Sequence, residues 1–369
     1  MKVLHVIAGN DNTAYPFLRM LEYEQFDNIE NFVLISVSKE NVIKKSPLLL
    51  VSTSALYLSN GSFDDKELIK IMEDVELIFW HSFSGSNGLG LKWLLHEKRF
   101  WKKSLWIISD IELRQLEYYC DTQVYNKDFY KMAYQISRHI RVAVQNIFSQ
   151  VSAQYVLELK IPYIVPYPWR FNNLHQLLNF APKTSKNDKP ELMIQLGYSG
   201  LAINQHEKLF QIINEINQKY YYLVPLNFVD NPSEKQNSKC YFKHLSSKRK
   251  LYPEQKISFL SKQIDQEEYL NYLHQINAVF LFKYYANCYQ LLLYSVFTNT
   301  PVFVIEDSLL FLKLRQIKFP LYSIQDIYNI NDIIQKHKMV SEQIKALLAK
   351  ELEYKNIVNI WKNLFKEIY

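Results

Sequence analysis

The chain has 369 residues and a net charge of +6, with 48 % hydrophobic and 15 % aromatic residues. This length and apolar content suit two packed domains, and the small positive excess excludes the dense basic composition of a dedicated nucleic-acid binder. Three distant cysteines, Cys120, Cys240 and Cys288, match neither a zinc-ligand spacing nor a disulfide framework, which favours a reducing compartment.

No segment has the ~18 consecutive apolar residues that a membrane span needs. The chain begins with a short apolar run that reads as a strand rather than a signal peptide. We therefore expect a cytoplasmic protein that is soluble or attached at the surface of the membrane's inner face.

Short apolar runs, each followed by a helical pattern, recur through the first half of the chain. They predict buried strands at residues 3–8, 32–37, 77–80, 105–109, 142–145 and 163–165. Their alternation with helices indicates an α/β domain with a parallel sheet. In such sheets ligands bind beyond the carboxyl ends of the strands, so the loops after these runs are the candidate site loops.

Gly9, Asn10 and Asp11 form the first such loop. They are small and polar, which suits contact with an acceptor substrate or with a donor phosphate. The alternative is a helix N-cap supplied by Asn12 or Thr13.

Three titratable residues follow later strands of this half. His81 ends the run at 77–80 and has an ordinary pKa near neutrality, so it could be a general base or a hydrogen-bonded structural residue. Asp110 and Glu112 follow the run at 105–109, where either carboxylate could accept a proton from an acceptor hydroxyl. The alternative is that Asp110 caps the next helix with Glu112 in its first turn. Nothing nearby completes a magnesium-type ligand set, so we expect no metal.

A polar stretch bounded by Pro182 and Pro190 is the predicted linker. It separates an expected acceptor domain, 1–185, from an expected donor domain, 190–340. The strand-helix alternation restarts in the second half, with strands at 192–196, 221–224, 257–260, 279–282 and 302–305 and helices at about 204–218, 266–275, 289–298 and 307–315. Apolar residues at helical spacing predict closing helices within 341–369.

Glycine is scarce in this chain. There are seven glycines, and five of them lie in two short loops, at 85–90 and 197–200. Gly197 and Gly200 stand between a buried strand and an amphipathic helix. Glycine allows close approach of a ligand or a positive φ, and free N–H groups at a helix start favour a diphosphate. The alternative is a tight turn without a ligand.

The remaining donor-binding candidates also follow strand ends. Asn204 and Glu207 have capping-box spacing with His206 between them. Lys283 could neutralise a phosphate, and Tyr284 or Tyr289 could stack on a base or sugar or merely cover the sheet. Glu306 could bind sugar hydroxyls; the alternative is that Asp307 caps the next helix. The remaining candidates are Tyr198, Ser199, Pro225 and Asn227. The basic run from Lys243 to Lys250 reads as a solvated loop, with contact to an anionic membrane surface as the alternative.

These motifs resemble glycosyltransferase family 56, whose members add TDP-linked 4-acetamido-4,6-dideoxygalactose to a lipid-diphosphate disaccharide in enterobacterial common antigen assembly. The opening from Leu4 to Asp11 is similar to that family's first strand and loop. The segment 197–206 resembles its Gly-Asn-Ser-Gly loop and Asn-Glu-His helix start, and 224–226 resembles its Val-Pro-Met strand end. The resemblance implies a GT-B architecture, with two facing Rossmann-like domains and a C-terminal helical closure.

The function that follows is transfer of a deoxy or hexose sugar from a nucleotide-diphosphate donor to a lipid-linked or surface-polysaccharide glycan, without metal or other cofactor. Asp110, Glu112 or His81 would assist deprotonation, while helix N–H groups and Lys283 stabilise the leaving diphosphate. Expected partners are the nucleotide sugar, the glycan acceptor and an anionic membrane surface, with no nucleic acid. The alternatives are a nucleotide-sugar epimerase on the same fold and a non-catalytic sugar-binding protein.

Overall fold

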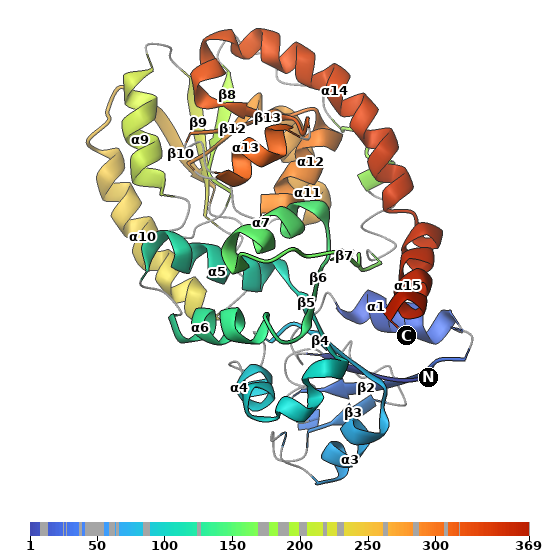
Figure 1. Cartoon of the computed structure of the whole chain (residues 1–369). Helices are drawn as coiled ribbons and strands as arrows, with labels where there is room; N and C mark the ends of the chain where they lie inside the picture. Colours follow the sequence, from blue (N-terminus) through green and yellow to red (C-terminus); the bar gives the residue numbers. More distant parts are fainter. Residues whose placement is uncertain are drawn as a thin grey trace. The chain divides into compact units, whose positions relative to one another are not determined.

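The computed structural model divides the chain into two compact units (Figure 1). Unit 1 comprises Met1–Arg170 together with Glu351–Tyr369, and unit 2 comprises Phe171–Lys350. The structure describes residues 1–7, 14–24, 26, 28–36, 39–40, 55–58, 63, 66–83, 89–123, 127–168, 177–183, 192–198, 205–216, 220–226, 232–260, 265–282, 288–305, 309–316 and 318–368.

Unit 1 contains a seven-stranded sheet in the order β3-β2-β1-β4-β5-β6-β7, in which all neighbours are parallel. The order reverses direction between β1 and β4, which is the topological switch point of a doubly wound sheet. The strands are β1 (Lys2–Ile7), β2 (Glu30–Ile35), β3 (Ala55–Tyr57), β4 (Leu77–His81), β5 (Ser104–Ile108), β6 (Arg141–Val144) and β7 (Tyr163–Ile164).

The helices of unit 1 cover this sheet because each has an apolar side. They are α1 (Ala14–Tyr23), α3 (Lys66–Asp74), α4 (Leu89–His96), the 3₁₀ helix η4 (Lys98–Lys103), α5 (Asp110–Thr122), α6 (Lys127–Ile136), α7 (Ile147–Leu157) and the C-terminal α15 (Tyr354–Ile368). The buried side of α15 packs with Phe17 and Phe79, and Trp361 is its largest buried residue. The last helix of the chain is thus part of the first unit's core.

Unit 2 contains a six-stranded parallel sheet in the order β10-β9-β8-β11-β12-β13, with its switch point between β8 and β11. The strands are β8 (Met193–Leu196), β9 (Tyr221–Pro225), β10 (Lys256–Leu260), β11 (Ala278–Leu281), β12 (Val302–Val304) and β13 (Leu321–Ser323). The helices are α9 (His206–Glu215), α10 (Pro232–Arg249), α11 (Gln266–Gln275), α12 (Tyr289–Thr298), α13 (Leu309–Gln316), η7 (Ile324–Asn329) and α14 (Ile330–Glu351).

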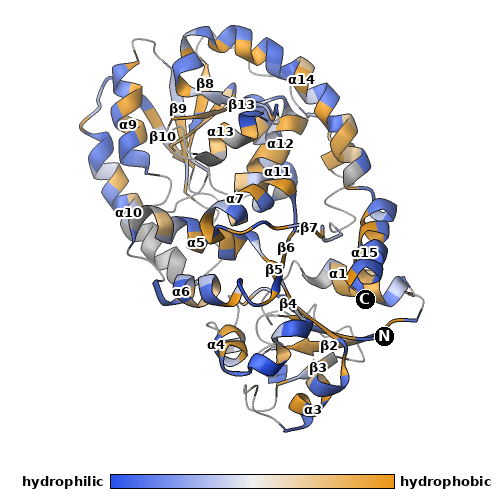
Figure 2. Ribbon diagram, in the orientation of Figure 1, coloured by the Kyte–Doolittle hydropathy of each residue, from blue (hydrophilic) through white to orange (hydrophobic). Residues whose placement is uncertain are grey.

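The hydropathy colouring agrees with the buried-strand prediction. The strands of both sheets are largely hydrophobic, whereas α9 and α14 alternate between hydrophobic and hydrophilic residues (Figure 2). Among the helices that the structure describes, none combines the length and the apolar character needed to cross a bilayer.

Three features differ from the sequence expectation. The short strands β3 and β13 were not predicted. The prediction of a loop for the basic run at 243–250 is wrong, since the run belongs to α10 up to Arg249 and buries Leu245. The capping position predicted at Asn204 is also wrong, because Gln205 is the N-cap residue of α9.

The division between the units lies at Arg170, ahead of the expected boundary at 185–190. The segment 177–183 is tied to α11, because the Lys183 Nζ lies 2.6 Å from a Glu267 carboxylate oxygen and the Lys183 N–H donates to Asn271 Oδ1 at 3.0 Å. The expected closing segment 341–369 divides as well. Its first part completes α14 in unit 2, and its last part from Glu351 joins unit 1.

Candidate functional site

The glycine loop of unit 2 begins at the switch point of its sheet. Leu196, the last residue of β8, is in register with Phe280 of β11, and the next N–H, that of Gly197, donates to the Phe280 carbonyl at 2.8 Å. Gly197 has φ 72°, a left-handed conformation that glycine adopts without steric cost. This glycine is therefore required by the backbone at the place where open α/β sheets bind ligands.

Helix α9 begins at His206 and is not capped by its N-cap side chain. Gln205 is the N-cap residue, with φ 47°, and makes no capping hydrogen bond. The helix thus begins one residue too late for a capping box between Asn204 and Glu207, which corrects that prediction. Asn204 itself lies outside the described residues. In this first turn the N–H of Lys208 donates to the Gln205 carbonyl at 2.9 Å and that of His206 contacts Tyr241. Among the described residues, the N–H of Glu207 is the first-turn donor that remains for an anionic ligand.

Glu207 turns to α10 instead of capping α9. Its carboxylate pairs with the imidazole of His244 and with Lys248 Nζ at 3.2 Å. The hydrogen bond from His244, followed by that from Lys248, lowers the pKa of Glu207. Its negative charge in the first turn is thereby offset by Lys248 and hydrogen-bonded by His244, so it does not leave an isolated anion beside a phosphate site.

His206 is the first residue of α9 and is fully buried. Burial lowers the pKa of His206 to about 4, so the ring is neutral at pH 7 and supplies no positive charge to a phosphate. Its Nδ1 lies 3.2 Å from the hydroxyl of Tyr241, which also contacts the backbone N–H of His206. Tyr241, on α10, thus contacts the first residue of α9. Sequence reasoning missed it because α10 was not predicted.

A cation that sequence reasoning also missed lies next to the switch point. Lys208, in the first turn of α9, is exposed and places its Nζ 4.5 Å from the ring centre of Phe282, the residue after β11. From the sequence, the position of Lys208 on the helix predicts only that its side chain is exposed. Its position beside Phe282, at the end of β11, comes from the packing of α9 on the sheet.

The other donor-binding candidates fall into two groups. Tyr198 and Tyr289 are half-buried, at the glycine loop and at the start of α12, and Pro225 is the buried last residue of β9. The remaining candidates lie outside the described residues: Ser199, Gly200, Asn227, Lys283, Tyr284 and Glu306.

In unit 1, Glu112 has a structural role. Ser109 is the N-cap of α5 and forms a capping box with Glu112, so the prediction that Asp110 caps this helix is wrong. The buried carboxylate of Glu112 accepts hydrogen bonds from the N–H groups of Ser109, at 2.8 Å, and Phe83. These bonds fix the turns after β4 and β5 to one another and leave Glu112 poorly suited to take up a proton.

Asp110 is the titratable carboxylate that remains at this edge. It is the first residue of α5, is half-buried, and its Oδ1 accepts a hydrogen bond from Ser149 Oγ of α7 at 2.6 Å. Burial raises the pKa of Asp110 to about 6, against hydrogen bonds from Ser149 and Asn146 that favour the charged form. A carboxylate with a pKa near neutrality is suited to proton transfer.

His81 is a buried core residue. Its Nε2 lies 3.0 Å from Nδ1 of His5, and its Nδ1 contacts the hydroxyl of Tyr167. Burial first, and the neighbouring His5 second, lower the pKa of His81 well below its usual value. Both ring nitrogens are engaged within the core, which favours the structural interpretation. The acceptor candidates Gly9, Asn10 and Asp11 lie outside the described residues.

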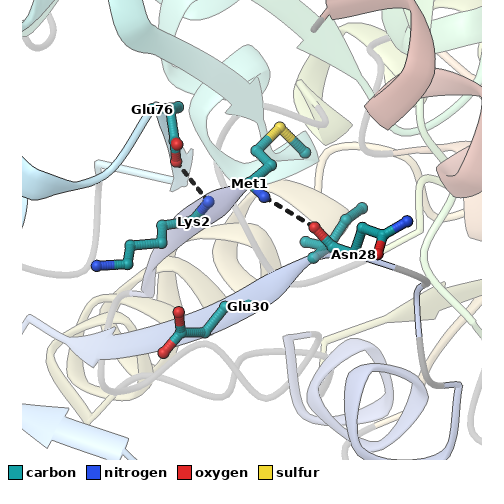
Figure 3. A pocket seen from close by; sticks show the side chains of 6 residues that line it. Met1, Lys2, Asn28, Glu30 and Glu76 are labelled. Atoms are coloured by element: carbon teal, nitrogen blue, oxygen red, sulfur yellow. Dashed lines mark hydrogen bonds between the residues drawn. The ribbon is translucent and has the colours of Figure 1, made fainter.

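A shallow pocket lies at the opposite, amino-terminal edge of the unit 1 sheet (Figure 3). It is lined by Met1, Lys2, Asn28, Ile29, Glu30 and Glu76. The Met1 amino group donates to the Asn28 carbonyl at 2.8 Å, and the Lys2 N–H donates to the Glu76 carboxylate. These polar groups satisfy one another at the edge away from the switch point, so the pocket is not a candidate site. Within the described ranges, no group of three or more His, Cys, Asp or Glu is arranged to hold a metal ion.

No family model matches this chain, and no curated protein matches it in sequence. Solved structures match its fold over its full length. A glycosyltransferase from Rickettsia africae is 12 % identical, with 100 % of this chain and 98 % of that chain covered and a TM-score of 0.55. Sucrose-phosphate synthase from Thermosynechococcus elongatus is 12 % identical, with 100 % and 99 % covered and a TM-score of 0.59.

A third similar structure is that of Anabaena HepE in complex with UDP-glucose, which is 11 % identical, with 99 % of this chain and 100 % of that chain covered and a TM-score of 0.57. Identities this low show a shared fold. The predicted fold class is confirmed: two parallel Rossmann-like sheets with C-terminal helices form the GT-B fold of glycosyltransferases. The closer resemblance to family 56 stays a prediction.

Proposed function

We propose that this protein is a GT-B glycosyltransferase that uses a nucleotide-diphosphate sugar. The observation that carries the proposal is Gly197, held at φ 72° at the β8/β11 switch point and followed by the uncapped start of α9. Among proteins of this fold, the Rickettsia structure is a glycosyltransferase and Anabaena HepE binds UDP and UDP-glucose. Fold and loop thus favour the same ligand class.

The donor diphosphate would lie against the first turn of α9. Its charge would meet the N–H of Glu207, the positive end of the helix dipole and the ammonium group of Lys208. As the sugar departs, negative charge grows on the leaving phosphate, and donors already aimed there stabilise the transition state more than the ground state. Ser199, Gly200, Asn204 and Lys283 are proposed to complete this cradle.

The base and sugar of the donor would be held by residues around the other strand ends of unit 2. We assign this role to Tyr198, Pro225, Asn227, Tyr284, Tyr289 and Glu306, the last through hydrogen bonds to sugar hydroxyls. His206 contributes by holding Tyr241 at the start of α9, because its buried ring is neutral and carries no charge to the ligand.

In unit 1 the proposed general base is Asp110. Its pKa of about 6 lets it stay charged at pH 7 and still accept a proton from an acceptor hydroxyl. Gly9, Asn10 and Asp11 are proposed to contact the acceptor, a lipid-linked or surface-polysaccharide glycan, with a deoxy or hexose sugar transferred. No step in this scheme is assigned to a metal ion.

A panel of nucleoside diphosphates, read by thermal unfolding, tests the donor site directly. The matching ligand at 100 times its Kd should stabilise the protein by about 2.7 kcal/mol. The same panel as nucleotide sugars, followed by NMR without acceptor, separates transfer from epimerisation. Conversion of the sugar with no acceptor would assign an epimerase, and absence of stabilisation by every diphosphate would refute the donor site.

A further inference from the structure

Helix α10 is attached to unit 2 by one side only. Tyr241 contacts His206, Leu245 is fully buried, and His244 and Lys248 pair with Glu207. These residues recur every three or four positions, so they lie on one side of the helix. That side faces α9.

The opposite side of α10 is basic. Lys243 lies on this opposite side of the helix, and Lys250 follows two turns after it. Lys243, Arg249 and Lys250 are exposed, and within the described part of the chain none has a carboxylate partner. Residues 241–253 contain four Lys or Arg and no Asp or Glu. We call this surface the α10 basic face.

Two large apolar side chains are exposed beside these cations. Phe242, directly before Lys243, is 38 % exposed, and Leu251, directly after Lys250, is 67 % exposed. Phe242 makes one edge-on ring contact, with Phe259 at 5.4 Å. Apolar side chains interleaved with unpaired cations are the composition of surfaces that lie in a membrane interface.

We propose that the α10 basic face docks on an anionic phospholipid surface, with the cations at the headgroups and Phe242 and Leu251 inserted between them. Clusters of four to eight Lys or Arg are attracted to anionic membranes, at about 1 kcal/mol for each residue near the surface. A nucleic acid would also attract the cations, but it offers no apolar layer for Leu251. This proposal rests on the proposed function. It adds that unit 2 makes the contact with the membrane that carries a lipid-linked acceptor.

Flotation of the full-length protein with vesicles tests the proposal. Wild type should bind vesicles of equimolar phosphatidylcholine and phosphatidylglycerol, and not pure phosphatidylcholine, and binding should fall steeply as salt is raised toward about 1 M. The pair Lys243→Gln and Lys250→Gln should weaken binding about 30-fold, and Leu251→Ser about tenfold.

Matched controls come from the exposed side of α14. Lys336→Gln with Lys338→Gln removes the same charge, and Leu347→Ser removes a similarly exposed leucine, and both should bind vesicles as wild type does. Equal binding to neutral vesicles, equal loss in the control variants, or preferential binding of a labelled DNA duplex would overturn the proposal. Stabilisation by nucleoside diphosphate in the same samples reports separately on the proposed function.

Discussion

The Nδ1 of His5 and the Nε2 of His81 lie 3.0 Å apart in the core of unit 1, and their outer contacts fix the proton on each ring. The Oδ1 of Asn31 can only accept, so His5 donates to it from Nε2 at 3.0 Å and must accept at Nδ1. His81 therefore donates from Nε2 and accepts from the Tyr167 hydroxyl at Nδ1. The four side chains form one directional chain, with both imidazoles neutral.

This chain makes the stability of unit 1 depend on pH. Burial lowers the pKa of His5 to about 4 and that of His81 well below 6.5. Between pH 6.5 and 4 the unfolded chain takes up protons that the folded core refuses, so the free energy of unfolding is highest above pH 6.5 and falls as the pH is lowered. At pH 5.5 we expect a loss of about 1 kcal/mol for each of the two histidines.

All six tryptophans belong to unit 1, so fluorescence during urea denaturation follows this unit. The raised pKa of Asp110, about 6, acts in the opposite direction, because the folded state binds that proton more tightly. The gain from one carboxyl is smaller than the loss from two histidines, so the free energy of unfolding still falls as the pH is lowered. An unfolding midpoint that is equal at pH 7.5 and pH 5.5 would contradict the neutral chain.

Gly197→Ala should lower both stability and donor affinity. A side chain in the left-handed region at φ 72° costs about 1–2 kcal/mol, and the strain would shift the loop that is proposed to hold the diphosphate. Gln123→Gly is the matched control, because Gln123 has φ 58° at the C-cap of α5, where glycine is tolerated or favoured. Thermal unfolding with and without nucleoside diphosphate reads both effects, and an alanine variant with unchanged affinity would remove the loop from the site.

Lys208→Gln should weaken nucleoside diphosphate binding by about tenfold, because a charge-assisted contact contributes roughly 1.5–3 kcal/mol. Its Nζ lies 4.5 Å from the Phe282 ring centre at the end of β11, within reach of the switch point. Lys336→Gln on α14 changes the net charge equally and should leave affinity unchanged. Isothermal titration at two salt concentrations distinguishes a local contact from a general charge effect.

Protonation of Asp110 should cause the loss of activity at acidic pH, which is the acid limb of the pH–rate profile. A base must be deprotonated to act, so kcat/KM should fall as pH drops through about 6. Ser149→Ala removes a hydrogen bond that favours the charged form and should move this limb to higher pH. Glu112→Gln should lower stability through the lost capping box while keeping the limb in place. A limb unmoved in the Ser149 variant would exclude Asp110 as the base.

Trp361 anchors the C-terminal helix to unit 1. It is fully buried, its ring centre lies 4.5 Å from that of Phe17, and its Nε1 donates to the Pro166 carbonyl at 2.9 Å. Trp361→Ala should cost about 3–5 kcal/mol of the free energy of unfolding. The neighbouring Ile360→Ala, on the partly exposed side of α15, should cost far less. Equal urea midpoints for the two variants would mean that α15 is not part of the core.

The sequence predicted most elements because their signals are local. Continuous apolar runs located eleven strands to within one or two residues. Helix α11 was predicted at 266–275, the range it has in the structure, where Asp265 caps it by accepting from the Glu268 N–H at 2.8 Å. The glycine at 197 was singled out for a positive φ, which the structure has.

The site was only partly predictable, since its chemistry depends on neighbours distant in sequence. His81 and Asp110 both follow strands as polar residues, yet one is enclosed by His5 and Tyr167 and the other stays half-buried beside Ser149. Nothing in the sequence around Lys208 or Tyr241 indicated that either residue lies at the site.

By itself the sequence determined the two α/β halves and the glycine loop between a strand and a helix, because hydrophobic period and backbone freedom are properties of neighbouring residues. Only the tertiary structure decided the strand order that puts Gly197 at a switch point, the return of α15 to unit 1 and the protonation of the buried histidines. Those outcomes depend on which surfaces bury one another, and burial and hydrogen-bond partners are set by contacts between residues far apart in the chain.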